Sequence, residues 1–223
     1  MCYTGAMTAN GADGRSQALP ADFYAGDTVR VARALLGKLL LRRLNGAWVA
    51  AAICETEAYV GRCDKACHAY AYRRTPRTET LFAPPGTAYV YFVYGMHHCL
   101  NAVTEPVGEP SAVLIRAAFP LLGHDAMALR RHGRPWADLT PVQRRNLLNG
   151  PGRLCQALAI DRAFDRASLV DGPNLLIAEA SPGLGLRALR PRKVRATPRI
   201  GIDYAEEAKA FPWRFLWERQ TLP

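Results

Sequence analysis

Two short segments of the chain combine acidic and aromatic side chains in a way that suits chemistry on a flat ring. The first, CETEAYVG at 54–61, contains Glu57 two residues before Tyr59. The second, YVYFVYGMH at 89–97, is dominated by tyrosine. A carboxylate among tyrosines can hold an electron-poor ring and activate a water molecule beside it. We expect the two segments to lie on adjacent strands, and we expect the ring to be a nucleobase because the chain carries a formal net charge of +10.

The spacing of these residues gives each segment a chemical face if the segments are extended. Side chains alternate along a strand, so Glu55, Glu57 and Tyr59 share one face, and Tyr89 and Tyr91 share another. An ordinary half-buried sheet would place tyrosines in the same way, so the tyrosines alone decide little. The two glutamates within an apolar strand are more informative, because carboxylates are rarely buried unless they are paired or functional.

The bulk composition bounds the class of protein. A chain of 223 residues and 24.5 kDa can bury a core as one domain. Its basic residues are almost all arginines, which bind phosphate through a planar fork and stack on bases, although a GC-rich genome also enriches arginine. We see no membrane-spanning stretch and no signal peptide, so we expect a cytoplasmic protein if the source is bacterial and a nuclear one if it is eukaryotic.

The cysteines indicate reduced thiols rather than a disulfide framework. Six cysteines are too few for a disulfide scaffold in a chain of this length. Cys63, Cys67 and His68 have a spacing found in zinc sites, and His98 and Cys99 follow later. No second pair of ligands completes such a site. We therefore expect no metal.

The remaining pattern predicts an α+β fold with one catalytic domain at 21–223, preceded by a flexible arm at 1–20. Asp27 is expected to cap a helix that stops at Gly37, and Asn45-Gly46 is expected to form a hairpin turn. The other expected elements are strands at 38–44, 47–59, 87–94, 98–104, 111–118 and 175–178, a polar loop at 60–80, helices at 125–132, 141–148 and 151–160, a basic strand pair around 187–199 and a C-terminal cap at 213–217.

An ordered series of motifs resembles the alkyladenine (3-methyladenine) DNA glycosylase family of base excision repair, and it spans about 23–217. The motifs are ETEAY at 55–59 with Gly61, Asp64 and His68, RTPR at 74–77, Pro85-Gly86, YVY at 89–91, YGM at 94–96, Cys99 and Asn101, LIR at 114–116, and NGP at 149–151. The resemblance implies a curved antiparallel sheet with a protruding β-hairpin and surrounding helices. It also implies an enzyme that excises alkylated or deaminated purines.

The resemblance assigns roles to residues at these positions. Glu57 would be the general base that activates the attacking water, and Arg116 would hold that water or a nearby phosphate. Tyr94 would enter the duplex and fill the gap left by the flipped nucleotide. Asn101 would reject guanine through its 2-amino group. The base pocket would be formed by Tyr59, His68, Tyr91, Asn101 and Leu114, and DNA-backbone contacts would come from Tyr89, Gly95, Met96 and Arg153.

These roles agree with what base removal requires. The N-glycosidic bond is hidden in the stack, so the nucleotide must be extruded at a cost of a few kcal/mol. A cationic alkylated purine is held by aromatic rings more tightly than a normal base. For His68 and Arg116 the alternatives are a histidine held by the backbone and a salt bridge at a strand end. Ordinary helix capping would also explain Asn149 and Gly150, although not Arg153.

The expected reaction stops at an abasic site. Lys65 is the only lysine near the motifs and the resemblance gives it no role, so we expect no Schiff base, no strand cleavage and no cofactor. The expected partner is double-stranded DNA with damaged purines, bound by a monomer. Departures from the family pattern are the tyrosine-rich loop at 69–74, Thr78 in place of Asn, and His97 at an often aromatic position. A non-catalytic nucleic-acid binder and a zinc- or thiol-dependent enzyme remain the alternatives.

Overall fold

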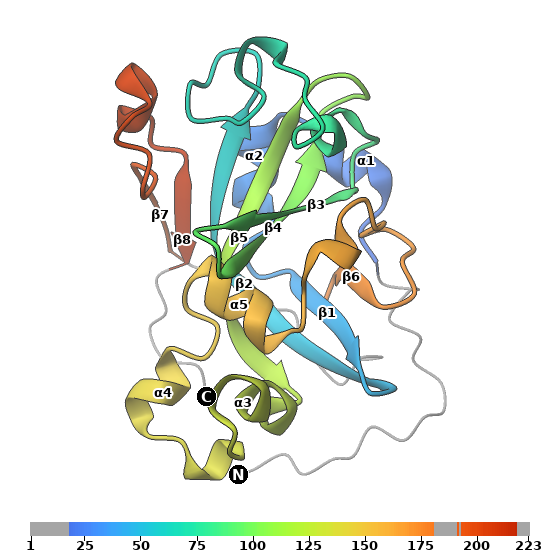
Figure 1. The fold of residues 1–223 in the computed structure, drawn as a ribbon, viewed down its shortest axis with the longest axis vertical. Helices are drawn as coiled ribbons and strands as arrows, with labels where there is room; N and C mark the ends of the chain where they lie inside the picture. Colours follow the sequence, from blue (N-terminus) through green and yellow to red (C-terminus); the bar gives the residue numbers. More distant parts are fainter. Residues whose placement is uncertain (1–17, 181–190, 192, 218–223) are drawn as a thin grey trace.

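One antiparallel sheet organises the chain. The computed structural model describes residues 18–180, 191 and 193–217. Within them the strands follow the order β3-β4-β5-β2-β1-β6, with β8 paired to β2 and β7 paired to β8 (Figure 1). The strands are β1 (Leu39–Leu44), β2 (Ala47–Val60), β3 (Ala88–Val93), β4 (His97–Thr104), β5 (Ser111–Leu122), β6 (Leu175–Ala178), β7 (Val194–Thr197) and β8 (Arg214–Trp217). Together with the helices around it, this sheet confirms the predicted α+β class.

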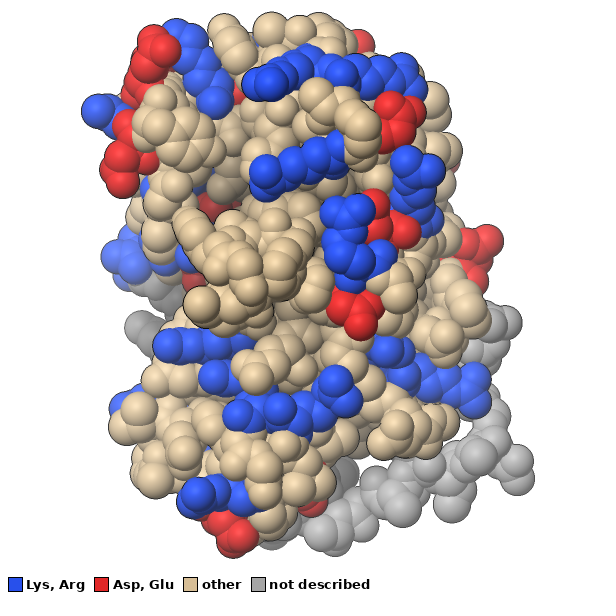
Figure 2. Space-filling model, viewed as in Figure 1, with Lys and Arg blue, Asp and Glu red and all other residues tan. Residues whose placement is uncertain are grey.

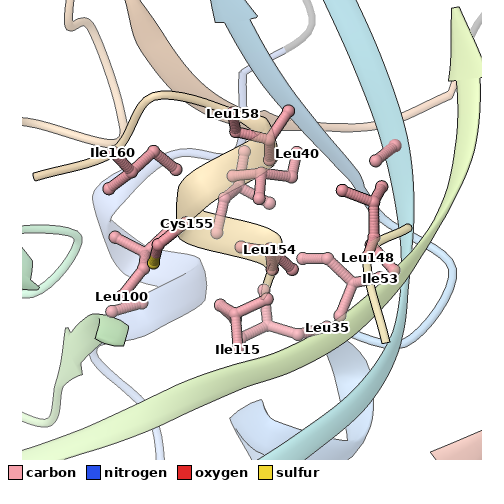
Figure 3. Close-up of a cluster of buried hydrophobic side chains, with 14 of the residues drawn as sticks. Leu35, Leu40, Ile53, Leu100, Ile115, Leu148, Leu154, Cys155, Leu158 and Ile160 are labelled. Carbon is pink, nitrogen blue, oxygen red and sulfur yellow. The ribbon is translucent and has the colours of Figure 1, made fainter. Parts of the chain in front are cut away.

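Short helices surround the sheet (Figure 1). They are α1 (Ala21–Tyr24), α2 (Thr28–Ala34), α3 (His124–His132), α4 (Pro141–Arg145) and α5 (Pro151–Ala157). Side chains from the end of α2, from α5 and from the central strands meet in one buried cluster, where Leu35, Leu154 and Ile115 lie together (Figure 3). Burying a leucine or isoleucine side chain stabilises a fold by about 1.5–3 kcal/mol. This cluster therefore holds α5 against β4 and β5.

The alternation of side chains on β4 and β5 separates this core from a second surface. Leu100 on β4 and Ile115 on β5 belong to the buried cluster. Their neighbours Asn101, Leu114 and Arg116 point the other way and line a cavity. The same two strands thus supply both the core and the wall of a pocket.

Local signals in the sequence set several of the element ends. The Asp27 side chain accepts a hydrogen bond from the backbone N–H of Arg30 at 2.9 Å, which confirms the predicted N-cap of α2. Asn45 and Gly46 both have positive φ, 49° and 82°, as a two-residue hairpin turn requires. The turn pairs Leu44 with Ala47 and confirms the predicted β1–β2 hairpin.

The relative position of the two chemical segments differs from the prediction. They were expected on adjacent strands, but β2 and β3 are separated in the sheet by β4 and β5. Sequence order misled here because β2 pairs with its hairpin partner β1 and, at long range, with β5 and β8. Register shifts between β2 and β5 around Glu55 bend the long strands at this point.

Several predicted boundaries also need correction. The sheet continues through β5 to Leu122, so the next helix begins at His124, and α4 ends already at Arg145. The predicted C-terminal cap is strand β8, and it pairs with β7. The predicted basic strand pair falls partly on 187–190 and 192, which lie outside the described residues. The segment at 60–80 contains 3₁₀ turns at Tyr70–Tyr72 and Glu79–Phe82.

Two residues within the predicted N-terminal arm, Ala18 and Leu19, are packed against the sheet. Residues 1–17 lie outside the described part of the chain, whereas Ala18 bridges to Ala178 and Leu19 is buried. The Leu19 N–H donates to the carbonyl of Ile177 at 2.9 Å, so the packed chain already includes these residues. No helix in the described part of the chain is long and apolar enough to cross a membrane.

Candidate active site

A cavity of about 470 Å³ lies between the sheet, the β3–β4 hairpin and the loops beside them. Its walls come from segments far apart in the sequence: the end of β2, the loop after it, β3, β4, β5, the start of α5 and the segment after β7. The residues used below that line it are Tyr59, His68, Arg77, Tyr89, Tyr91, Tyr94, Asn101, Leu114, Arg116, Arg153, Ile200 and Tyr204. The structure thus brings together all the predicted base-pocket residues.

Glu57 lies directly behind this wall, with no exposed side-chain surface. One carboxyl oxygen, Oε2, accepts hydrogen bonds from the hydroxyl of Tyr59 at 2.7 Å and from Nη1 of Arg116 at 3.4 Å. The other, Oε1, accepts from the backbone N–H of Ile200 at 2.9 Å. All three of these donors belong to residues that line the cavity. A carboxylate held in this way is fixed in position at the edge of the pocket.

Arg116 is oriented by a second carboxylate. Its Nε donates to Oε1 of Glu55 at 2.8 Å, and Nε of Arg214 on β8 donates to the same oxygen at 2.6 Å. Burial alone would lower the pKa of Arg116, but the nearby carboxylates of Glu57 and Glu55 outweigh this and raise it. The salt bridge that was an alternative for Arg116 therefore exists, and it points the guanidinium along the cavity wall toward Glu57.

Tyr59 remains a hydrogen-bond donor under all ordinary conditions. Burial, and then the adjacent Glu57 carboxylate, raise the pKa of its hydroxyl well above the usual value. Its ring also packs beneath the guanidinium of Arg199, whose Cζ is 4.7 Å from the ring centroid. Nη2 of Arg199 donates to Oδ1 of Asp64 at 2.7 Å, and this ion pair is completely buried. Tyr59 is thereby locked between the candidate base and a buried ion pair.

Aromatic rings form a second part of the cavity wall. The ring of His68 meets that of Tyr91 edge-on at a centroid separation of 4.7 Å, and Tyr89 lies 5.3 Å from Tyr91. Nδ1 of His68 is 3.0 Å from the Tyr89 hydroxyl, and Nε2 is 3.4 Å from Nη2 of Arg77. Burial, reinforced by the charge of Arg77, lowers the pKa of His68 to about 4. The imidazole is therefore neutral at physiological pH, and both of its nitrogens have partners.

Tyr89 belongs to this wall and not to an outer surface. We predicted a contact between Tyr89 and the DNA backbone, but its side chain is almost fully buried. Burial also raises the pKa of its hydroxyl to about 12. A residue that is covered in this way and bonded to His68 cannot reach a phosphate on the outside of the protein.

Asn101 and Leu114 face each other across β4 and β5 as paired residues. The side-chain amide of Asn101 donates to the carbonyl of Tyr89 at 3.0 Å and makes a longer contact with that of Cys99 at 3.4 Å. Because the amide nitrogen is bound to the backbone, the side chain has a fixed position at the floor of the cavity. It therefore sets how much space the cavity offers there.

Tyr94 stands at the tip of the β3–β4 hairpin. It is 81% exposed, and Met96 beside it is 68% exposed. Tyr94 and Gly95 both have positive φ, 53° and 67°, an uncommon backbone conformation for a tyrosine. A large aromatic ring held in such a turn and left in solvent has no structural role inside the protein. This position fits a residue that enters a partner.

The start of α5 lies close to the turn end of this hairpin. A Cβ added to Gly152 would come within 2.8 Å of the His97 ring, so only glycine allows this approach. His97 therefore packs against the start of α5. Arg153 follows in the first turn of α5 and also lines the cavity, with Nη1 donating to the carbonyl of Asn149 at 3.3 Å.

Charge is distributed unevenly over the face that carries the hairpin. Figure 2 shows Lys and Arg side chains gathered over the upper loops and over the lower helical part, on either side of a largely uncharged central area. The tip of the β3–β4 hairpin falls in that central area when Figures 1 and 2 are compared. The exposed Tyr94 thus lies between two basic regions, which are suited to contact with a polyanion.

Some residues of the site were not foreseen from the sequence. The segment that follows β7 closes one side of the cavity with Ile200, Gly201 and Tyr204, and Ile200 also binds Glu57. Its sequence, RIGIDY at 199–204, has no charge pattern or periodicity that predicts such a role. Arg214 was likewise missed, because its link to Glu55 depends on the pairing of β8 with β2.

The cysteine and histidine side chains considered for zinc do not gather into a site. In the described part of the chain no group of three or more His, Cys, Asp or Glu side chains is arranged to hold a metal ion. Cys67 is buried and its Sγ lies 3.7 Å from the carbonyl of Pro110, whereas Cys63 is exposed. Burial raises the pKa of the Cys67 thiol to about 12, which disfavours the thiolate that metal binding or nucleophilic attack requires.

The fold and the site together define a nucleobase-handling enzyme, and comparison with known proteins makes the class specific. The sequence profile of the methylpurine-DNA glycosylase family matches residues 22–221. A protein of Desulfitobacterium hafniense is 47% identical over 88% of this chain and 93% of its own length. One from Bacillus cereus is 47% identical over 89% of this chain and 95% of its own length. One from Clostridium perfringens is 44% identical over 87% of this chain and 92% of its own length. Each of the three carries the name "Putative 3-methyladenine DNA glycosylase".

The chain therefore belongs to the methylpurine-DNA glycosylase family. It is a DNA repair enzyme that hydrolyses N-glycosyl bonds, and its substrate is DNA. This confirms the family that the motifs indicated. The alternative of a non-catalytic nucleic-acid binder is set aside.

Proposed function

We propose that the chain removes 3-methyladenine, 7-methylguanine, ethenoadenine and hypoxanthine from double-stranded DNA, using a water molecule activated by Glu57. The observation that carries this proposal is the position of Glu57, which is held by Tyr59, Arg116 and Ile200 at the edge of an aromatic cavity. The volume of about 470 Å³ is ample for one extruded purine. The aromatic wall favours an alkylated purine, since its positive charge is attracted to ring faces.

In the proposed reaction the water oxygen bonds to C1′ while the bond from C1′ to the base nitrogen breaks. The electron pair of that bond leaves with the base, and Glu57 takes a proton from the water. Arg116, which touches both Glu57 and the cavity, orients the water or a nearby phosphate. The Glu57 carboxyl has no exposed surface in the free protein, so one of its three donors must shift to admit the water.

We further propose that the enzyme leaves an abasic site and an uncut strand. An enzyme that also cuts the strand uses an amine to form a Schiff base. No lysine lines the cavity among the described residues. Lys65, the lysine closest to the motifs, instead pairs with Glu206 at 2.7 Å and Glu207 at 3.0 Å. An amine held between two carboxylates stays protonated, and it is not available as a nucleophile.

The proposed partner is duplex DNA, bound by a monomer through the basic regions on either side of the hairpin. A net charge of +10 favours association with a polyanion and makes it sensitive to salt. Since these relatives are bacterial, we place base excision in the cytoplasm, on the nucleoid.

The substrate range is tested by incubating the protein with duplexes that each contain one of the four lesions. Release of the free base is measured by chromatography, with and without a chelator. The proposal predicts release from the lesion duplexes, insensitivity to the chelator and no release from undamaged DNA. Binding of the duplexes without release of any base would contradict it.

Replacing the exposed hairpin tyrosine should weaken capture of the flipped nucleotide. We expect Tyr94→Ala to cost about 1 to 3 kcal/mol, the usual worth of a base–aromatic stack. Fluorescence of a base analogue next to the lesion measures flipping directly. Single-stranded substrates should be less affected, because there is less stacking to replace. Flipping as strong as in the parent would show that Tyr94 is not the wedge.

Shrinking Asn101 should relax the exclusion of guanine. We expect Asn101→Ser or Asn101→Ala to raise activity on guanine opposite thymine by roughly 10 to 200-fold, since a steric block of a few atoms is worth about 1 to 3 kcal/mol. Hypoxanthine lacks the 2-amino group, so its excision should be spared. Single-turnover rates on both bases decide between the roles. If both rates fall together, Asn101 is a structural residue and the exclusion lies elsewhere.

A further inference from the structure

Arg77 lines the cavity, but the proposed reaction gives it no role. Its Cζ lies 5.5 Å from the centroid of the Tyr91 ring, and Nη2 lies 3.4 Å from Nε2 of His68. It lines the cavity together with those two residues. A guanidinium at this place adds a positive charge and several N–H donors to an otherwise aromatic wall.

Arg77 has no carboxylate partner among the described residues, unlike Arg74 and Arg62 of the same loop. Arg74 binds Glu79 through two hydrogen bonds of 2.9 and 2.7 Å. Arg62 pairs with Glu105 at 2.6 Å. Arg77 contacts His68, Tyr91 and Tyr89, which all line the cavity. Most of its donors therefore remain available to a ligand in the cavity.

The contact with Arg77 also fixes what His68 can offer. Arginine only donates, so Nε2 of His68 accepts from Arg77 and the imidazole proton resides on Nδ1, facing the Tyr89 hydroxyl. In this arrangement His68 has no proton left to donate to position 6 of a purine. On this side of the cavity Arg77 therefore adds several N–H donors to the hydroxyls of Tyr89 and Tyr91.

We propose that Arg77 is a specificity-determining residue that donates to O6 and N7 of a flipped neutral purine such as hypoxanthine. Arginine pairs with this edge of guanine in a bidentate manner, and hypoxanthine presents the same two acceptors. The 6-amino group of 3-methyladenine is a donor and cannot pair with Arg77. A blocked N7 removes one acceptor in 7-methylguanine, and the positive charge of both alkylated bases is repelled by the guanidinium. The inference rests on the proposed function of the cavity.

The test compares Arg77→Met, Arg77→Lys and the parent in single-turnover excision of hypoxanthine, 3-methyladenine and 7-methylguanine. Arg74→Met is the matched control, because Arg74 lies in the same loop and does not line the cavity. We expect Arg77→Met to lower the rate for hypoxanthine relative to the alkylated bases by roughly 5- to 100-fold, the discrimination that one bidentate pair supplies. Arg77→Lys should restore only part of it, since an ammonium lacks the planar fork. Arg74→Met should leave the ratio unchanged.

Other outcomes overturn the inference. If Arg77→Met leaves the ratio of the hypoxanthine rate to the alkylated-base rates unchanged, Arg77 does not read the base. Equal losses on all three bases would lead to the same conclusion, and they would indicate that Arg77 contacts the DNA backbone instead. Arg77 is exposed, so a folding defect is not expected, and thermal unfolding of each variant verifies this. If the parent itself released none of the bases, the proposed function would fail, and the role of Arg77 would fail with it.

Discussion

Glu57→Gln should abolish base excision while leaving binding of a lesion duplex within a few-fold of the parent. The amide keeps the shape of the carboxyl and much of its hydrogen bonding, but it cannot take a proton from water. General catalysis of this kind contributes about 10² to 10⁴-fold in rate. Single-turnover excision of hypoxanthine measures the rate, and titration of the same duplex measures the binding. Near-normal excision by the variant would remove Glu57 from the mechanism.

Glu55→Gln is the matched control on the same strand. Glu55 accepts from Arg116 and Arg214 and is not among the residues that line the cavity. Its replacement should loosen Arg116 without removing the base, so the loss of rate should be smaller than for Glu57→Gln. Equal losses in the two variants would assign the effect to the ion-pair cluster as a whole.

Arg199→Met should lower the free energy of unfolding by about 3 to 5 kcal/mol, the usual effect of leaving one charge of a buried pair unpaired. Arg199 and Asp64 have no exposed side-chain surface and make two contacts with each other. Arg199 also donates to the carbonyls of Ala58 at 2.7 Å and Ala208 at 3.1 Å. It thereby ties the strand that bears Glu57 to the segment that closes the cavity. Urea unfolding measures the change.

Lys65→Met provides the comparison on the surface, because its ion pairs with Glu206 and Glu207 involve exposed carboxylates. Screening by solvent makes such pairs weak, so this variant should unfold almost as the parent does. Equal stabilities of Arg199→Met and the parent would show that the buried pair does not anchor the cavity. Because Arg199 precedes Ile200, some loss of excision should accompany the loss of stability.

Elements defined by local chemistry were predictable from the sequence. The cap at Asp27, the turn at Asn45-Gly46 and the helix that begins at Pro151 follow from residues close to one another in the chain. The ends of β5 and α4 were not predictable, because tertiary pairing and packing decide where a strand or helix stops. The separation of β2 from β3 depends on long-range pairing, which periodicity does not reveal.

The same distinction holds for the site. Alternation along one strand was enough to place Glu57 beside Tyr59, and their hydrogen bond agrees with it. The contributions of Ile200 and Arg214 were not predictable. They arise only when the segment after β7 and strand β8, both distant in the sequence, pack against β2. Arg77 was visible as part of a motif, but its contact with His68 required the fold.

The central claim is that a water molecule, and no group of the protein, displaces the base. The most direct test is a single-turnover reaction on a duplex with one hypoxanthine, run with and without borohydride and analysed by denaturing electrophoresis before and after alkali. The account predicts an uncut strand before alkali, cleavage at the lesion after alkali, and no protein joined to DNA by borohydride. Strand cleavage without alkali, together with a protein–DNA adduct trapped by borohydride, would contradict it and would show that an amine of the protein attacks C1′.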